Sequence, residues 1–351
     1  MLFYRWRFPG QWFNDEMVRV VVIAPVETAS ITMTGLFDVI GKADRAFGAL
    51  HGRPGRDTVF DVKLASLDGK AVHYQDRVTV NVDLAADDVN APDLVIVPGL
   101  DDDLGPSFAL NAAWAPWLAQ WHAAGSVVAA SCSGAFLMAE AGLLDGRTAT
   151  THWLYADDFR RRFPAARLAA HRLIIDNGDV ITSGGATTFL DLALYLVERF
   201  AGRERANAAA RVLLIDGART SQLPYVTTGA EYRDHDDDLV RKAQNLIDTK
   251  LSGSLRVEDL AGKVGLSSRT LSRRFHDAVG QGPQAYIQYC RVDTARKLLE
   301  TGDQPIENIR RQVGYRDPTA FRRAFKEQTG LAPSEYRDRY GWTTNADARR
   351  P

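Results

Sequence analysis

The C-terminal third of the chain carries one pattern twice. The stretches EDLAGKVGLSSRTLSRRFHDAVGQGPQAY (258–286) and ENIRRQVGYRDPTAFRRAFKEQTGLAPSEY (307–336) align with one inserted residue in the turn. Matched residues recur along both copies: Gly265 with Gly314, Phe275 with Phe325, Gly280 with Gly330, Pro283 with Pro333, and Tyr286 with Tyr336. Self-similarity at a fixed period predicts two copies of one supersecondary unit.

Each copy has the order of a helix-turn-helix motif. In the first copy a short helix over VEDLAGKVG leads to Gly265, which permits a tight turn. Ser267 is placed to cap a second helix from about Ser268 to Ala278, since a serine hydroxyl accepts a bond from a free N–H of the first turn. In such motifs the second helix enters the major groove of DNA.

The second helix of each copy presents arginine on its outer face. Helical spacing buries Leu271 with Phe275 in the first copy, and Phe321 with Phe325 in the second. Arg274 then lies nearer the flank of its helix. The residues predicted to face DNA are Arg269, Thr270, Ser272, Arg273, Thr319, Arg322 and Arg323. Arginine suits this role because its planar fork can donate two hydrogen bonds to guanine.

A solvated helix face is the alternative interpretation of one arginine-rich helix, and two such helices in register behind the same turn argue against it. The charge of the chain is also divided. Residues 254–340 hold 16 Lys and Arg against 11 Asp and Glu, whereas residues 1–253 hold 25 against 32. A basic module joined to an acidic one indicates that only the C-terminal part binds a polyanion.

Residues 238–340 resemble the AraC/XylS-type DNA-binding domain. The family pattern VGY-x(5)-FRRAFK-x(3)-G-x(2)-P-x(2)-YR is present at 313–337, and a connecting helix is expected over 282–301. The resemblance implies that both second helices enter successive major-groove segments on one face of the duplex. Arg310 departs from the family, which usually has a small residue there. Cys290, in the connecting helix, is expected to be a small buried hydrophobe.

The N-terminal part alternates apolar strands with helical segments. Buried strands are predicted at 18–26, 93–99 and 126–131, with a strand and hairpin insertion over 58–83. Helices are predicted over the intervening ranges, at 34–50, 108–125 and 187–202. This pattern predicts an open α/β sandwich, flavodoxin-like in class, ahead of the all-α tandem helix-turn-helix domain.

Cys132 stands between a predicted strand and the helix that follows it. The small residues after it, beginning with Ser133, suit a strained strand-to-helix elbow, where a helix N-terminus favours thiolate. Gly99 ends a neighbouring strand and can bring a backbone N–H to the same pocket, and His152 is a candidate base. A cysteine at a strand end is more often structural than catalytic, so both roles stay open.

Residues 18–202 resemble the PfpI-like members of the class I glutamine amidotransferase superfamily, on the stretch ASCSGAFLMAEAGLLDGRTATTHW (130–153) and on SGGATTFLDLALYLVE (183–198). Two features depart from the active relatives. Ser133 replaces the histidine of the protease-like members, and Thr32 stands where many members have an acid, with Glu27 several residues too early. The resemblance places Cys132, Ser133, Gly99, His152 and Thr32 around a pocket and leaves catalysis without its full set of partners.

An amidotransferase-like domain fused to an AraC-type domain is the arrangement of GlxA family transcription regulators. The resemblance implies that the first domain senses a small effector, amine- or amino-acid-like, and forms a homodimer. Double-stranded DNA and RNA polymerase are the implied partners, with no cofactor, metal or membrane. The alternative is a cysteine-dependent amidase or hydratase-like enzyme that uses Cys132 and His152.

The expected boundaries are an N-terminal extension at 1–16, the sensing domain at 17–219, a linker at 220–237, the DNA-binding domain at 238–340 and a tail at 341–351. Asp234, Asp236, Asp237, Asp238 and His235 end the linker, and we interpret these carboxylates as stabilising the N-terminus of the next helix rather than as a metal site. Two cysteines, no signal peptide and no apolar run near 20 residues predict a cytoplasmic, nucleoid-associated protein.

Overall fold

A computed structural model describes residues 5–8, 11–13, 17–26, 28–52, 58–74, 77–100, 104–217, 219–226, 232, 235–253 and 255–341. The chain forms two compact units, which meet in sequence between Gln222 and Leu223. Glu27, Asp234 and the tail from 342 onward lie outside the described residues. The predicted extension is described only at β1 (Arg5–Phe8) and β2 (Gln11–Phe13), which pair antiparallel.

The first unit is built on a seven-stranded sheet with the order β12-β13-β9-β8-β3-β4-β7. Its strands are β3 (Val18–Ile23), β4 (Phe60–Ser66), β7 (Leu84–Ala85), β8 (Leu94–Val97), β9 (Val127–Ser131), β12 (Ile174–Asp176) and β13 (Val180–Ser183). All neighbours are parallel except β12, which runs antiparallel to β13 at one edge. The strands β3, β8 and β9 are almost continuously buried, as the Val- and Ile-rich runs predict.

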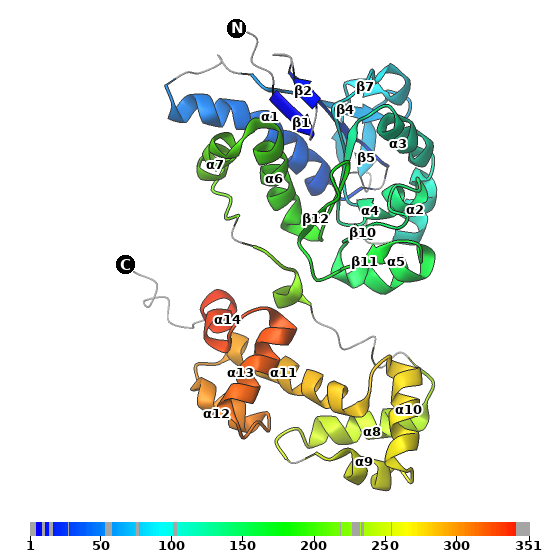
Figure 1. The fold of residues 1–351 in the computed structure, drawn as a ribbon, viewed down its shortest axis with the longest axis vertical. Helices are drawn as coiled ribbons and strands as arrows, with labels where there is room; N and C mark the ends of the chain where they lie inside the picture. Colours follow the sequence, from blue (N-terminus) through cyan, green and yellow to red (C-terminus); the bar gives the residue numbers. More distant parts are fainter. Residues whose placement is uncertain are drawn as a thin grey trace. The chain divides into compact units, whose positions relative to one another are not determined.

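Helices cover both faces of this sheet (Figure 1). One face is covered by α1 (Ser30–Leu50), α6 (Phe189–Ala201) and α7 (Arg203–Val212). The other is covered by α2 (Leu104–Asn111), α3 (Trp114–Ala123), α4 (Gly134–Glu140) and α5 (Ala156–Arg162). Each face buries its own apolar cluster, so the predicted α/β sandwich is confirmed.

Two details of the first unit differ from the sequence prediction. The single helix predicted over 108–125 is two helices, α2 and α3, broken at Ala112 and Ala113. Pro116 lies in the first turn of α3, where proline is tolerated because its missing N–H has no helical partner. Helix α1 begins at Ser30, four residues before the predicted start. The predicted insertion holds β4, which joins the main sheet, and a hairpin of β5 (Val72–Tyr74) and β6 (Val78–Val80).

The second unit is helical within its described residues. Its helices are α8 (Asp238–Thr249), α9 (Val257–Lys263), α10 (Ser268–Val279), α11 (Pro283–Thr301), α12 (Ile306–Gln312), α13 (Pro318–Thr329) and α14 (Pro333–Tyr340). The long helix α11 contributes to two separate apolar cores, one with α8–α10 and one with α12–α14 (Figure 1). Cys290 packs against the first core and is only half-buried, less than the sequence prediction of a buried position.

The two copies of the repeat adopt matching backbone conformations. Gly265 and Gly314 are the second residues of the turns, with φ of +73° and +85°, and Gly280 and Gly330 end the second helices with φ of +74° and +76°. These left-handed values explain why glycine recurs at both places. The turn of the second copy is one residue longer, between α12 and α13, where the sequence shows its insertion.

Candidate functional sites

Cys132 lies in the turn between β9 and α4. Its φ is +57°, a left-handed value that a side chain adopts only when the surrounding structure imposes it. The backbone N–H of Cys132 donates to the carbonyls of Ser183 and Gly184, at 3.1 and 3.0 Å, which fixes the turn to the end of β13. The residue is 8% exposed. The turn is therefore the strained strand-to-helix elbow that the sequence predicts.

Two glycines allow the elbow to pack closely against the end of β8. A Cβ on Gly134 would lie 2.5 Å from the carbonyl oxygen of Pro98, closer than real atoms approach. A Cβ on Gly99 would lie 3.1 Å from the Cβ of Cys132 and 3.5 Å from its Sγ. Any side chain at Gly99 would therefore press on the thiol.

The structure brings Gly99, Thr32 and Ser133 together beside Cys132. The N–H of Gly99 donates to Thr32 Oγ1 at 3.1 Å, and Thr32 Oγ1 donates in turn to the carbonyl of Ala29 at 2.8 Å. Ser133 is fully buried, and its Oγ accepts the N–H of Leu100 at 2.8 Å. The N–H that an oxyanion hole would need from Gly99 is thus engaged by Thr32.

His152 is held close to the same strand ends. Its Nδ1 accepts the N–H of Leu154 at 3.0 Å, so in the neutral ring the proton sits on Nε2. The ring packs directly against Gly185, where any Cβ would overlap Cδ2 of the imidazole. The preceding Thr151 donates its hydroxyl to the carbonyl of Cys132 at 2.8 Å. A neutral imidazole in this tautomer offers no lone pair at Nε2 to take a proton from a thiol.

Gln222 forms hydrogen bonds beside the same strand ends. Sequence reasoning missed it because it falls in the predicted linker. Its side chain is almost fully buried. Nε2 donates to the carbonyls of Thr151 and Ala170 at 2.9 and 2.8 Å, and Oε1 accepts the N–H of Gly185 at 3.0 Å. No local sequence pattern predicts such a residue, because its hydrogen-bond partners are far apart in the chain.

Two buried hydroxyls lie next to the elbow without a hydrogen-bond partner among the described residues. They belong to Ser131 and Ser183, which pair across β9 and β13. Both residues are fully buried. An unsatisfied buried hydroxyl costs about 1–3 kcal/mol, so this pair of hydroxyls is a polar feature of the core that the described residues do not satisfy.

The first copy of the repeat presents its outer face as the sequence predicts. Leu271 and Phe275 are fully buried, while Arg269 and Arg273 are exposed. Thr270 and Ser272 are half-buried, and Ser267 caps α10 by accepting the Thr270 N–H at 3.2 Å. Arg274 does not face outward, since its Nε donates to Asp237 Oδ2 at 2.7 Å.

Asp237 is the last residue of the predicted linker, and its carboxylate lies at the start of α8. It accepts the N–H groups of Leu239 and Val240, both at 3.0 Å, so Asp237 caps α8, and Asp238 lies in the first turn of that helix. The hydrogen bond from Arg274 holds the pKa of Asp237 below its usual value. Within the described ranges no group of three or more His, Cys, Asp or Glu side chains is placed to hold a metal ion.

The second copy repeats this arrangement around a buried arginine. Phe321 and Phe325 are buried. Thr319, Arg322 and Arg323 are exposed on α13. Arg310, the departure from the family pattern, is 6% exposed; its Nε donates to Glu307 at 2.9 Å and its Nη1 to the carbonyl of Tyr315.

The charge of Arg310 is balanced inside its own motif. Its hydrogen bonds lower the pKa of Glu307 to about 2, so the carboxylate stays ionised beside the guanidinium. Because Arg310 also bonds the carbonyl of Tyr315, it fixes the turn before α13. Arg310 therefore packs without disturbing the second motif.

Comparison with known proteins assigns both units. The family model described as the DJ-1/PfpI family matches residues 18–199, and the helix-turn-helix domain model matches 260–339. The HTH-type transcriptional regulator GbdR of Pseudomonas aeruginosa is 26% identical over 78% of this chain and 73% of its own length. The HTH-type transcriptional regulator GlxA of Rhizobium meliloti is 28% identical over 60% of this chain and 64% of its own. A solved AraC family transcriptional regulator from Pseudomonas putida aligns at 21% identity with a TM-score of 0.47, over 56% of this chain and 98% of that chain.

An α/β unit with a cysteine elbow, followed by two helix-turn-helix copies around one long helix, defines a class of two-part regulators that bind DNA. The chain belongs to the DJ-1/PfpI family and carries an AraC-type helix-turn-helix region, which confirms the resemblance to GlxA-type regulators. No helix in the described part of the chain has the length and apolar character needed to cross a membrane.

Proposed function

We propose that this chain is a sequence-specific transcription regulator whose α/β unit senses a small effector and whose tandem helix-turn-helix unit binds a promoter or operator. The observation that carries the proposal is the pair of helices α10 and α13. Each buries three apolar side chains, exposes two arginines and has a side-chain cap at its N-terminus. Two such helices suit two successive major-groove segments of one duplex.

The effector pocket is proposed at the elbow. Cys132, Ser133, Gly99, His152 and Thr32 gather at the ends of the strands, where open α/β sheets bind ligands. The unsatisfied hydroxyls of Ser131 and Ser183 favour a ligand with a polar head. An amine- or amino-acid-like metabolite fits this preference and the resemblance to GlxA-type regulators.

Sensing rather than catalysis is favoured by the hydrogen bonds at the elbow. The N–H of Gly99 is taken by Thr32, and Nδ1 of His152 is taken by Leu154. A cysteine-dependent amidase or hydratase remains the second candidate, because the left-handed φ of Cys132 is typical of a nucleophile elbow. Cys132→Ala separates the two: a sensor keeps specific duplex binding and alters its ligand response, whereas an enzyme loses turnover of an amide substrate.

Homodimer formation and contact with RNA polymerase complete the proposal, and both are expected where the chromosome lies, in the cytoplasm.

The test is selection of duplexes from a random library by the full chain, followed by binding titrations with and without candidate amines and amino acids. We expect enrichment of one duplex family and an affinity that changes with one ligand class. Binding of selected and scrambled duplexes with equal affinity would overturn the proposal.

A further inference from the structure

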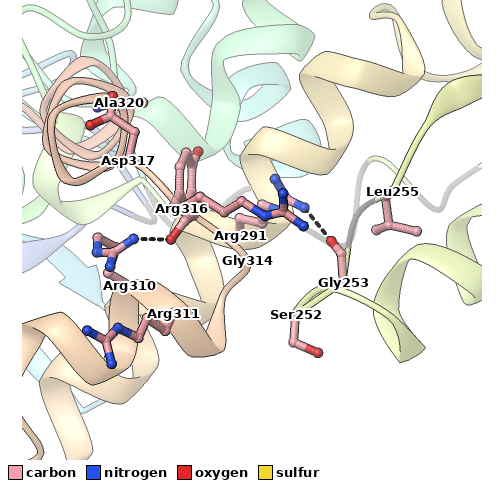
Figure 2. A pocket seen from close by; sticks show the side chains of 11 residues that line it. Ser252, Gly253, Leu255, Arg291, Arg310, Arg311, Gly314, Arg316, Asp317 and Ala320 are labelled. Carbon is pink, nitrogen blue, oxygen red and sulfur yellow. Dashed lines mark hydrogen bonds between the residues drawn. The ribbon is translucent and has the colours of Figure 1, made fainter.

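A cleft in the second unit lies between the loop that precedes α9 and the second helix-turn-helix copy. It has a volume of about 690 Å³ and is lined by that loop, one residue of α11, the end of α12, the turn before α13 and one residue of α13. Figure 2 shows Arg291 reaching from α11 toward the carbonyl of Gly253, and Arg310 bonded at the opposite wall. The loop ahead of the first copy, the connecting helix α11 and the second copy therefore contribute to a single cleft.

Four arginines line this cleft, and two of them keep charge available for a ligand. Arg310 and Arg311 both pair with Glu307, Arg311 through its Nε at 3.2 Å. Arg316 is exposed and has no ion pair among the described residues. The one carboxylate on the lining is Asp317, which is engaged by the N–H groups of Thr319 and Ala320 at the start of α13.

Arg291 contributes a donor that the protein itself does not satisfy. Its Nη2 donates to the carbonyl of Gly253 at 2.9 Å, but its Nε is buried with no partner among the described residues. Leaving such a donor unpaired costs free energy, more so on a charged group. An anion in the cleft would accept from Nε and offset that cost.

A second patch of positive charge continues the cleft around the same loop. Lys250 and Lys263 line an adjoining depression that shares Gly253 and Leu255 with the cleft, and Asp259 is its acidic residue. Because both ammonium groups border the same depression, the Lys250 ammonium lowers the pKa of Lys263. A negatively charged ligand that spans the loop would relieve this repulsion.

The position of the cleft indicates which kind of anion it binds. In a helix-turn-helix motif the start of the second helix contacts the bases and the first helix crosses the DNA backbone. The walls of the cleft are the segment that enters α9, the first helix of copy one, and, in copy two, the end of α12 with the turn that enters α13. When both second helices occupy major-groove segments, the backbone between those segments passes this cleft.

We propose that the cleft binds a backbone phosphate of the duplex between the two half-sites, with Arg291 and Arg316 as its donors. This inference rests on the proposed DNA-binding function. A phosphate contact positions the protein on the duplex and carries no base information, so its loss weakens all sequences equally. One lost contact also reduces the slope of log affinity against log salt by about 0.9.

The test uses the full chain, its selected duplex and an unrelated duplex of equal length. Arg316→Gln is compared with Arg339→Gln, which removes the same charge from an exposed position on α14. We expect Arg316→Gln to weaken both duplexes by the same factor, on the order of 5- to 10-fold, and to lower the salt slope by about one. Arg291→Gln, checked for folding by circular dichroism, should act in the same direction, and Arg339→Gln should match the wild type.

The outcomes separate this inference from the proposed function. If the wild-type chain did not prefer its selected duplex, the proposed function would be contradicted. If specificity were normal and Arg316→Gln matched Arg339→Gln in affinity and in salt slope, only the inference would be contradicted. Weakening of the selected duplex only would assign Arg316 to base readout and overturn the phosphate site. A thermal shift with inorganic phosphate at matched ionic strength, lost in Arg316→Gln while DNA binding is unchanged, would assign the cleft to a free phosphate-bearing ligand instead.

Discussion

Replacing Gln222 by alanine tests whether this side chain secures the strand ends around the elbow. The substitution removes one acceptor and one amide donor from a site that is 2% exposed. The N–H of Gly185 and the carbonyls of Thr151 and Ala170 each lose a bond of 2.8–3.0 Å. At about 1 kcal/mol for each buried group left unpaired, the low end of the usual range, the free energy of unfolding should fall by about 3 kcal/mol.

Thermal unfolding followed by tryptophan fluorescence measures this loss in the unit that contains Gln222. Trp114, Trp117, Trp121 and Trp153 all lie in that unit. For a unit of 222 residues, a loss of about 3 kcal/mol corresponds to a fall in Tm of about 6–12 °C. The matched control is Gln120→Ala on the exposed face of α3, which should change stability by less than about 0.5 kcal/mol. Equal Tm values for the two variants would refute the role assigned to Gln222.

Three further changes test other parts of the account. Ser267→Ala removes the cap of α10 and should lower the stability of the second unit by about 1 kcal/mol in urea unfolding followed by circular dichroism, whereas Ser267→Gly should cost only a few tenths; equal losses would contradict the capping role. Gly185→Ala should displace the His152 ring and lower Tm by several degrees. The control Gly41→Ala, which has open space around it on α1, should raise Tm slightly. An unchanged Tm for Gly185→Ala would mean that the ring is free to move. Burial raises the pKa of Asp179, but hydrogen bonds from Arg147 and His122 outweigh it and hold the pKa at about 2. Because the folded pKa lies below the unfolded one, this carboxylate stabilises the fold above about pH 4 and loses that effect toward pH 2, so Asp179→Asn should show a smaller fall in Tm from pH 6 to pH 3.5; an unchanged fall would exclude the carboxylate as a source of acid sensitivity.

The helical unit was predictable nearly residue by residue because its signals are local. Glycine must occupy the left-handed positions at Gly280 and Gly330, and proline opens α11 and α14 at Pro283 and Pro333. These requirements repeat with the motif, so the two copies could be aligned from the sequence alone. Their buried aromatic pairs follow from helical spacing.

The elbow could be located from the sequence, but the hydrogen bonds around it could not be predicted. Cys132 with its small neighbours has a local pattern. The bonds that decide its chemistry join residues far apart, such as Gly99 with Thr32 and Gly185 with Gln222. Arg310 differs, because its partners Glu307 and Tyr315 lie only three and five residues away, yet the bond to the Tyr315 carbonyl depends on how the turn folds.

The central claim is that the two exposed arginine helices read one duplex together. The most direct measurement is the affinity of the full chain for its selected duplex and for a scrambled duplex, with wild type compared to Arg269→Ala and Arg322→Ala. Each variant should lose about 1–3 kcal/mol for the selected duplex and relax specificity at one set of base pairs, a different set for each helix. Loss from only one helix, or equal loss for selected and scrambled duplexes, would contradict the claim.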